Sequence, residues 1–487
     1  MKHRLVLAIV FALSSFGIQP AISDIKNGAQ CKKLGVVKTL NNIQYTCIKT
    51  GNRKVWFKSP KSKSSSSKSS NGRRTPITPW GQMEHRVDYL PPIAISGNPK
   101  TLISDASELA SISDCKIRDG GAAGVIQNNP QRHFVSGFPN YPERANFTQN
   151  ATLQFVAVDF VDLPGKRKPS EDLETITTFL KDFFESQTHL DLALKFRIPA
   201  DYIRMPKPVQ DYGLAQEFFG GGWSPTSSFE YVKEAVRISD PVIDFSGANM
   251  FAVVVPPEVT RKQIATFVAQ SGEPGQQIYT NEGEIYNFLL MRGPLGSESY
   301  ELLNWAHELG HLFGMTDIRN TVNVSRQNSS DLGMLDLMNS MIAPELLAWQ
   351  RFIMGLLTDD QVRCVTTSKP LTHRIVPVAQ PENLTKMVVI PIGEFKALAI
   401  ESRRSHGYDQ NLGSLNEGVF VYSIDTTIPY RYSTMKLIPS PSSSDTTWKR
   451  DSALKIGESV TYEGWRISYL ETGSFGDVIK TEKLGAK

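Results

Sequence analysis

Two histidines, a glutamate and an aspartate lie within one short stretch of the chain, at a spacing that could bind a metal ion. The stretch is Trp305–Asp317, with the sequence WAHELGHLFGMTD. On an α-helix, residues four positions apart lie on nearly the same face, so His307 and His311 could bind one ion together. Imidazole nitrogens are common zinc ligands, at about 2.0–2.1 Å from the metal. The spacing therefore predicts a zinc site.

The other polar residues of the stretch favour a catalytic zinc site over a structural one. Glu308 follows His307 directly, where it could accept a proton from a water on the metal without binding the metal itself. Gly314 could end the helix and let the chain turn, and Asp317 could then supply a third ligand. Three protein ligands leave one position open for water. We therefore expect Glu308 to be the general base of a zinc hydrolase.

The alternative is an ordinary apolar helix that carries two histidines by coincidence. The extended pattern HExxHxxGxxD is much more specific than HExxH alone. In addition, the helix around the motif is strongly apolar, and buried histidine and glutamate side chains without partners are costly. Both observations favour the metal site.

The extended pattern is similar to the zinc signature of the metzincin clan of metallopeptidases, in the variant with aspartate as third ligand. Within the clan, the stretch resembles the immune inhibitor A-type secreted bacterial metallopeptidases. The resemblance implies peptide-bond hydrolysis and a Met-turn, in which a methionine lies beneath the metal. Asp336–Ser340 fits this turn and gives the role to Met338, with Met334 and Met341 as nearby alternatives.

The resemblance extends from about Leu153 to the C-terminus, although its specific matches are confined to two patches. Three further segments resemble parts of the family, namely VAVDFVD near residue 158, Pro344–Leu357, and AIESRRSHGYDQNL with the GVFVYSID that follows it. The long connection from Met315 to Met338 departs from the family pattern. The family also gives no counterpart for the N-terminal part of the chain.

The first 23 residues have the pattern of a secretory signal peptide. Lys2 and Arg4 precede the apolar run Leu5–Ile18, and small residues follow where a signal peptidase would cut. No cysteine lies at the cleavage point, and no later apolar run reaches the roughly 18 residues that a membrane span needs. We therefore expect a secreted protein, extracellular or held at the cell surface.

Export permits disulfide bonds, and the chain has four cysteines that allow three pairings. Cys31 and Cys47 lie in one short segment, which favours their pairing and leaves Cys115 to pair with Cys364. The alternative for Cys115 is a free thiol that binds the metal in a latent precursor, which would leave a second cysteine unpaired.

The N-terminal part is strongly basic, whereas the rest of the chain is acidic. Residues 24–76 contain 13 Lys and Arg against one acidic residue. We expect a small disulfide-stapled module at 24–58 and a Ser/Lys-rich linker at 59–79. The charge suggests an anionic partner such as a cell-wall polymer or a membrane surface, and the alternative is a solvated spacer. Nothing in the sequence suggests nucleic-acid binding.

The remainder predicts an α+β protein with two folded regions. Residues 80–368 would form the metzincin-like peptidase domain, a mixed sheet with the active-site helix, in which 80–150 is a pro-like or wrapping segment. Residues 369–487 would form a β-sandwich. The pattern predicts helices at 171–188, with Ser170 as N-cap, and at 229–238. It predicts strands at 153–162, 190–198, 250–255 and 284–291.

Three acidic residues could bind a structural calcium ion or simply cap turns, namely Asp162, Asp240 and Asp244. The isolated histidines are expected to be structural: His85, His133, His189, His373 and His406.

Taken together, these residues predict a secreted zinc endopeptidase that acts on extracellular proteins or peptides. One alternative is a catalytically silent surface-binding or adhesion protein on the same scaffold, although the intact Glu308 argues against it. A second alternative is hydrolysis of a non-peptide amide or ester by the same chemistry.

Overall fold

The structure of the 487-residue chain is a computed structural model. It describes residues 30–33, 36–40, 43–50, 53–58, 87–126, 134–214, 225–260, 263–264, 268–270, 277–291, 299–319, 331–429 and 432–485. The predicted signal peptide and the linker 59–79 lie outside the described residues. The chain divides into two compact units, residues 1–70 and 71–487.

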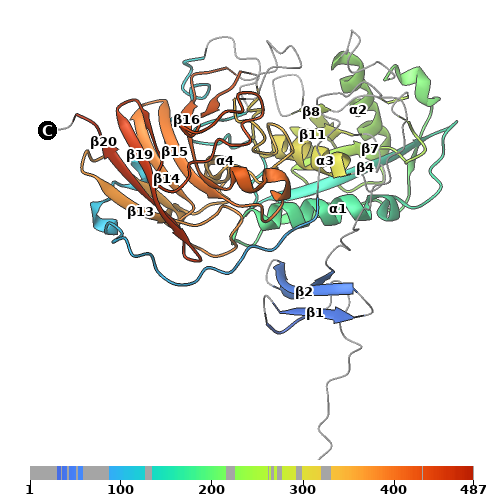
Figure 1. Ribbon diagram of the computed structural model, residues 1–487. Helices are drawn as coiled ribbons and strands as arrows, with labels where there is room; N and C mark the ends of the chain where they lie inside the picture. The colour runs from blue at the N-terminus through green and yellow to red at the C-terminus, as the bar shows by residue number, and fades with distance from the viewer. Residues whose placement is uncertain are drawn as a thin grey trace, which may run out of the picture. The chain divides into compact units, whose positions relative to one another are not determined.

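The N-terminal unit is a three-stranded antiparallel sheet in the order β1-β2-β3 (Figure 1). Its strands are β1 (Val37–Leu40), β2 (Ile43–Thr50) and β3 (Arg53–Lys58). The disulfide Cys31–Cys47 joins the start of the unit to β2, and Cys47 lies opposite Trp56 of β3. The buried cluster described here consists of both cysteines, Tyr45 and Trp56. A core this small needs such a crosslink, and the predicted pairing is confirmed.

The second unit begins with a mixed six-stranded sheet, in the order β5-β4-β7-β11-β8 with β6 also paired to β4. The strands are β4 (Ala151–Phe160), β5 (Leu194–Arg197), β6 (Ile203–Met205), β7 (Met250–Val254), β8 (Val268–Gln270) and β11 (Asn287–Leu290). Only β8 is antiparallel to its neighbour among these pairs. A separate hairpin is formed by β9 (Ile278–Thr280) and β10 (Gly283–Ile285).

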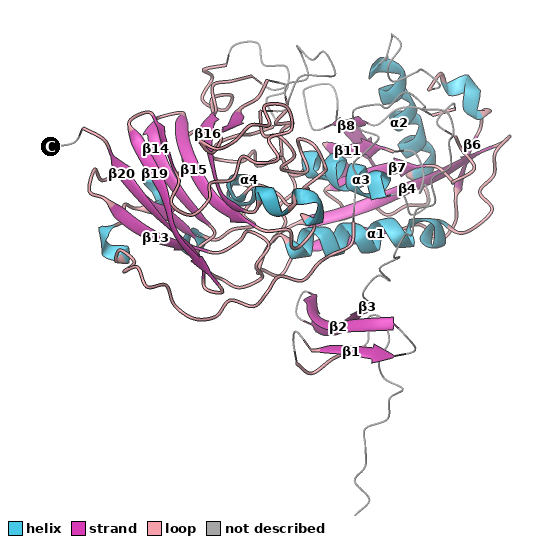
Figure 2. Ribbon diagram, viewed as in Figure 1, coloured by secondary structure: helices cyan, strands magenta, loops and turns pink. Residues whose placement is uncertain are grey.

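Helices cover both faces of this sheet (Figure 2). Residues of α1 (Pro169–Ser186) and α3 (Ser299–Leu312) share one hydrophobic core with one face of β4, and α2 (Pro225–Ser239) packs in the core on the other face. Because both faces are covered, nearly every residue of β4 is buried, which explains its continuous apolar sequence. Helix α1 starts earlier than predicted. Its N-cap is Lys168, and Ser170 lies inside the first turn.

Two further sheets face each other and form the C-terminal β-sandwich. One has the order β12-β14-β15-β16-β17 and the other β13-β20-β19-β18. A separate hydrophobic cluster lies between them. The strands are β12 (Val362–Cys364), β13 (Leu371–Ile375), β14 (Met387–Gly393), β15 (Lys396–Arg403), β16 (Gly418–Asp425), β17 (Met435–Leu437), β18 (Ser459–Tyr462), β19 (Trp465–Gly473) and β20 (Gly476–Lys483). The whole second unit therefore has an α+β fold.

The five-stranded sheet of the sandwich is buried on both faces. Alternate residues of β16 point in opposite directions, as in any strand. Val419 and Val421 belong to the core between the two sheets, whereas Phe420 and Tyr422 belong to the core that contains α1 and α3. The helix α4 (Ala348–Ile353) lies in that same shared core. Residues 71–487 therefore form one compact unit in which the sandwich completes the packing of the helical part.

Residues 87–126 run along the sandwich as a strap. Their backbone bonds to it at several points, including Leu90 with Gly407 and Ser104 with Thr372. The disulfide Cys115–Cys364 then joins the strap to β12. This pairing confirms the prediction, and the alternative of a free Cys115 thiol on the metal is wrong. None of the helices in the described part of the chain is long and apolar enough to cross a bilayer.

Candidate metal centre

The predicted metal-binding helix is α3, and it ends where the motif predicts. The amide of Gly314 donates to the carbonyl oxygen of His311 at 3.0 Å, and Gly314 has a φ of +96°. A Cβ at this position would lie 2.4 Å from Asn140 Oδ1, so the turn requires glycine. The reversal brings Asp317 back toward the helix.

The structure brings the three predicted ligands together. His307 Nε2 lies 3.3 Å from Asp317 Oδ1, and His311 Nε2 lies 4.0 Å from the same oxygen. One ligand atom of each residue lies within 4.8 Å of the other two. Ligands about 2 Å from a common zinc ion are separated by about 3–4 Å, so this spacing fits one ion. It is the only such group of His, Cys, Asp and Glu side chains in the described ranges.

Both imidazole rings are held by backbone carbonyl groups on the side away from Asp317. His307 Nδ1 donates to the carbonyl oxygen of Leu337 at 3.1 Å, and His311 Nδ1 donates to that of Met315 at 2.8 Å. A proton on each Nδ1 leaves the Nε2 lone pair available to a metal. Hydrogen bonds of this kind fix the orientation of metal-binding histidines in general. The donor set and its supporting bonds therefore fit zinc.

The Met-turn candidate lies against the metal-binding helix. A Cβ built on Gly310 would lie 3.2 Å from Met338 Sδ and 3.1 Å from Met315 Sδ. Gly310 lies between the two histidines in the sequence. Because it has no side chain, two sulfur atoms can approach α3 at this position. The role of Met338 beneath the metal stays a prediction. Met315, whose sulfur atom lies at a similar distance, was not anticipated.

Glu308 is partly exposed beside the ligand cluster, and it is not one of the three ligands. Burial raises the pKa of its carboxyl group to about 7, with the Asp317 charge acting in the same direction and His307 opposing it. A general base works best when its pKa lies near the operating pH. Its position and pKa therefore suit proton transfer at a metal-bound water.

The ionisation states of the three side chains suit the binding of a cation at the point where they meet. Burial lowers the pKa of His311 to about 4, so this imidazole is neutral and able to bind a metal. Burial also acts to lower the pKa of His307, but the hydrogen bond and charge of Asp317 raise it above its usual value. Burial works against ionisation of Asp317, yet the two histidines hold its pKa well below the usual range. A divalent cation would satisfy the same carboxylate.

Sequence reasoning missed two residues that support the site. Asp336 has a φ of +75° and is fully buried, and its carboxylate accepts from the amides of Met338 at 2.7 Å and Leu347 at 2.6 Å. Arg319 carries a positive charge that lowers the pKa of Glu308. The only sequence signal for Arg319 was that it lies two residues after Asp317. The signal for Asp336 was that it is the first residue of the predicted turn Asp336–Ser340.

The three acidic residues considered for calcium do not form a group among the described side chains. Asp162 accepts from the amide of Val209, Asp240 from that of Asn281, and Asp244 from that of Ser246. Each carboxylate therefore stabilises a turn or loop, which is the alternative stated above. No described site supports the calcium prediction.

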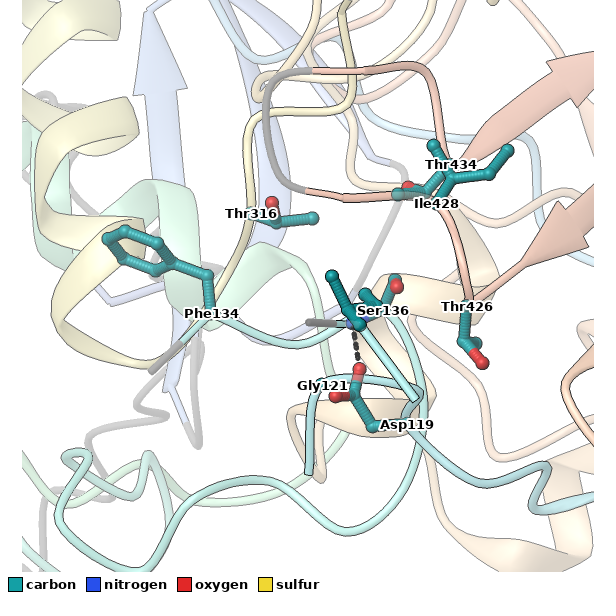
Figure 3. Close-up of a pocket in the computed structure, with 9 residues that line it drawn as sticks. Asp119, Gly121, Phe134, Ser136, Thr316, Thr426, Ile428 and Thr434 are labelled. Atoms are coloured by element: carbon teal, nitrogen blue, oxygen red, sulfur yellow. Dashed lines mark hydrogen bonds between the residues drawn. The ribbon is translucent and has the colours of Figure 1, made fainter. Parts of the chain in front are cut away.

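A small cavity of about 10 Å³ lies beside Thr316, the neighbour of Asp317 (Figure 3). Figure 3 shows Phe134, Ser136 and Thr316 on one side, and Ile428 and Thr434 of the sandwich on the other. The cavity has room for about one water molecule.

A wider groove has a volume of about 350 Å³. Ile428 lines both this groove and the small cavity. Asp331 of its lining precedes the segment Asp336–Ser340. The other lining residues come from the connection between β16 and β17 and from β17 itself: Ile428, Pro429, Tyr432, Ser433 and Lys436. The groove is large enough to hold a side chain or a short peptide segment.

The chain matched none of the protein-family models and none of the curated proteins with which it was compared. The metzincin resemblance therefore stays a prediction that rests on the motif residues.

Proposed function

We propose that the protein is a secreted zinc-dependent endopeptidase that hydrolyses extracellular proteins or peptides. The observation that carries the proposal is the convergence of His307, His311 and Asp317 on one point beside Glu308. Zinc, when bound, would lower the pKa of a coordinated water and polarise the substrate carbonyl.

The side chains of the chain would supply the remaining steps. His307 and His311 would hold the metal through Nε2, with Asp317 as the third ligand. Glu308 would accept the proton of the attacking water and pass it to the leaving amine, since a carboxyl group with a pKa near 7 can do both. The groove that includes Tyr432 is the proposed site for part of the substrate.

The cellular setting belongs to the same proposal. Two disulfides and the predicted signal peptide fit an exported protein. The basic residues of 24–58, of which Lys32, Lys33 and Lys54 are exposed, would attract an anionic cell-wall polymer or membrane surface.

The decisive experiment compares the wild-type protein with Glu308→Gln, using an unfolded protein as substrate and measuring bound zinc in both. We expect both proteins to bind one zinc ion and the variant to lose at least about 100-fold in kcat, the lower range for loss of a general base. A chelator should abolish wild-type cleavage. Glu301→Gln is the matched control, because Glu301 lies on the same helix two turns earlier.

The outcomes separate the alternatives. If both proteins bind zinc and neither cleaves a protein substrate, the peptidase proposal fails and the surface-binding alternative is preferred. If the wild type cleaves only small amides or esters, the substrate class is wrong. If the wild type binds no zinc, the ligand assignment is wrong.

A further inference from the structure

A series of buried hydrogen bonds, joined by short pieces of backbone, connects the sandwich to the proposed metal ligand His307. It starts at Glu401 of β15, whose Oε2 accepts from the amide of Ala348, the first residue of α4, at 2.8 Å. The preceding amide, that of Leu347, donates to Asp336 Oδ2 at 2.6 Å. The start of α4 is thus held by one carboxylate from the sandwich and one from the Met-turn segment.

Asp336 carries the connection from α4 to the metal site. Its Oδ1 accepts from the amide of Met338 at 2.7 Å, which fixes the turn around Leu337. The carbonyl oxygen of Leu337 accepts from His307 Nδ1 at 3.1 Å. Glu401, Asp336 and Leu337 are fully buried, so water does not compete for these bonds.

The sandwich end of this chain is fixed by buried ion pairs. Arg403 is fully buried and donates to Glu401 Oε1 at 2.6 Å and to Asp409 Oδ2 at 2.9 Å. The same guanidinium donates to the carbonyl oxygen of Glu345, between the Met-turn and α4. Tyr422 of β16 donates its hydroxyl to Glu401 Oε2 at 2.8 Å. Glu401 therefore has little freedom to move.

We propose that Glu401 and Arg403 of the sandwich are positioning residues for the metal centre, acting through α4, Asp336 and Leu337 on His307. This inference rests on the proposed metal site. The sandwich then serves as the structural support of the Met-turn. A shift of Glu401 would move the Met-turn backbone and, with it, the carbonyl group that orients His307.

A buried carboxylate of the other sheet of the sandwich offers a matched control. Asp477 of β20 is fully buried and accepts from Arg404 at 2.6 Å and from the Tyr469 hydroxyl at 2.5 Å. Asp477 also accepts from the hydroxyl of Ser402, which lies between Glu401 and Arg403, but among the described residues its carboxylate accepts no bond from α4 or from residues 336–340. Loss of either buried carboxylate should destabilise the sandwich, but only Glu401 should affect the metal site.

The test compares Glu401→Gln and Asp477→Asn by two readouts, hydrogen exchange of the metal-free protein and zinc affinity. We expect Glu401→Gln to speed amide exchange in residues 331–348 and to weaken zinc binding on the order of ten-fold, as loss of outer-sphere support does elsewhere. Asp477→Asn should speed exchange in β19, in β20 and around Ser402 and Arg404, but not in residues 331–348, and it should leave zinc affinity unchanged. Tyr422→Phe is a milder second variant if Glu401→Gln does not fold, and it should act in the same direction.

Two results would overturn the proposal. One is a Glu401→Gln protein whose exchange changes in β14 to β16 but not in 331–348. The other is equal effects of Glu401→Gln and Asp477→Asn on residues 331–348 and on zinc affinity, which would indicate general destabilisation. Because exchange is measured without metal or substrate, these results are independent of whether Glu308→Gln loses peptidase activity.

Discussion

At the scale of single residues, the proposed metal ligands are oriented by neighbours that are not ligands themselves. His307 and His311 are each held at Nδ1 by a carbonyl group, that of Leu337 for His307 and that of Met315, in the turn after α3, for His311. Gly310 provides the space for the sulfur atoms of Met315 and Met338. Both histidines thus depend on backbone segments that follow α3 in the sequence.

Arg319 should control the pH range in which Glu308 acts as a base. Its positive charge lowers the pKa of Glu308, which burial raises to about 7. Removal of the charge in Arg319→Met should raise the pKa of Glu308 further, so the ionised base would form only at higher pH. We expect the acidic limb of the kcat/KM profile, measured between about pH 5 and pH 9, to move to higher pH.

Arg319→Lys keeps the charge and is the control for this prediction. Its acidic limb should stay near that of the wild type. A uniform loss of activity in Arg319→Met at every pH, with no movement of the limb, would contradict an electrostatic role for Arg319.

At the scale of elements, the sequence predicted those helices and strands whose formation depends on the local spacing of apolar residues. The helices at 171–188 and 229–238 correspond to α1 and α2, and the apolar run at 153–162 corresponds to β4. The predicted strand at 284–291 is divided, because β10 ends at Ile285 in a hairpin and β11 starts at Asn287 in the main sheet. Local alternation cannot distinguish two strands that follow each other in different sheets.

The metal site divides in the same way between local and distant information. The spacing HExxHxxGxxD predicted that His307, His311 and Asp317 lie together, because one helix and one turn place all three. The role of Leu337 and the connection from Glu401 could not be predicted, because those bonds join residues 30 and 53 positions apart in the sequence. Contacts of this kind depend on the assembled fold.

His373 of β13 should make the sandwich sensitive to acid. It is fully buried, with Nδ1 accepting from Arg363 at 3.0 Å and Nε2 at 2.9 Å from Thr481 Oγ1. Burial and the charge of Arg363 lower its pKa to about 3. The unfolded chain binds this proton near pH 6.5, whereas the folded protein does not. The stabilisation is therefore complete above about pH 6.5 and is lost as the pH falls toward 3.

We expect this group to reduce the free energy of unfolding by up to about 1.4 kcal/mol per pH unit below about pH 6.5. Urea unfolding at a series of pH values would measure the slope. His373→Gln has no such proton and should show a shallower dependence by about that amount. Equal slopes in the two proteins would show that His373 does not cause the acid sensitivity.

At the scale of the whole molecule, the sandwich cannot be regarded as an appended module. Its five-stranded sheet packs Phe420 and Tyr422 into the hydrophobic core that contains α1 and α3. Its first strand, β12, precedes the predicted boundary at residue 369. Removal of 369–487 would expose that core. The strap at 87–126 further joins the beginning of the second unit to its end.

The disulfide Cys115–Cys364 should contribute strongly to the stability of this unit. It spans 249 residues, and long loops give the largest loss of entropy in the unfolded chain. The double substitution of Cys115 and Cys364 by serine should lower the free energy of unfolding by about 4–5 kcal/mol at most, measured by denaturant unfolding. The same change at Cys31 and Cys47 is the control and should leave the unfolding of residues 71–487 unaltered. An equal loss in both variants would contradict this assignment.

The strap also determines what a cut in the N-terminal region would release. A cut between the two units would set free the basic N-terminal module and leave the strap in place. After a cut between residues 90 and 114, the downstream piece would keep the Cys115–Cys364 disulfide. The upstream piece, which carries the N-terminal module, would be held to the sandwich only by noncovalent contacts such as the backbone hydrogen bonds of Leu90 with Gly407. Maturation by loss of the whole 80–150 region would require reduction of the bond between Cys115 and Cys364 as well as a cut. In the oxidising compartment that we propose for this protein, the crosslink would favour release of the basic N-terminal module while the second unit stays intact.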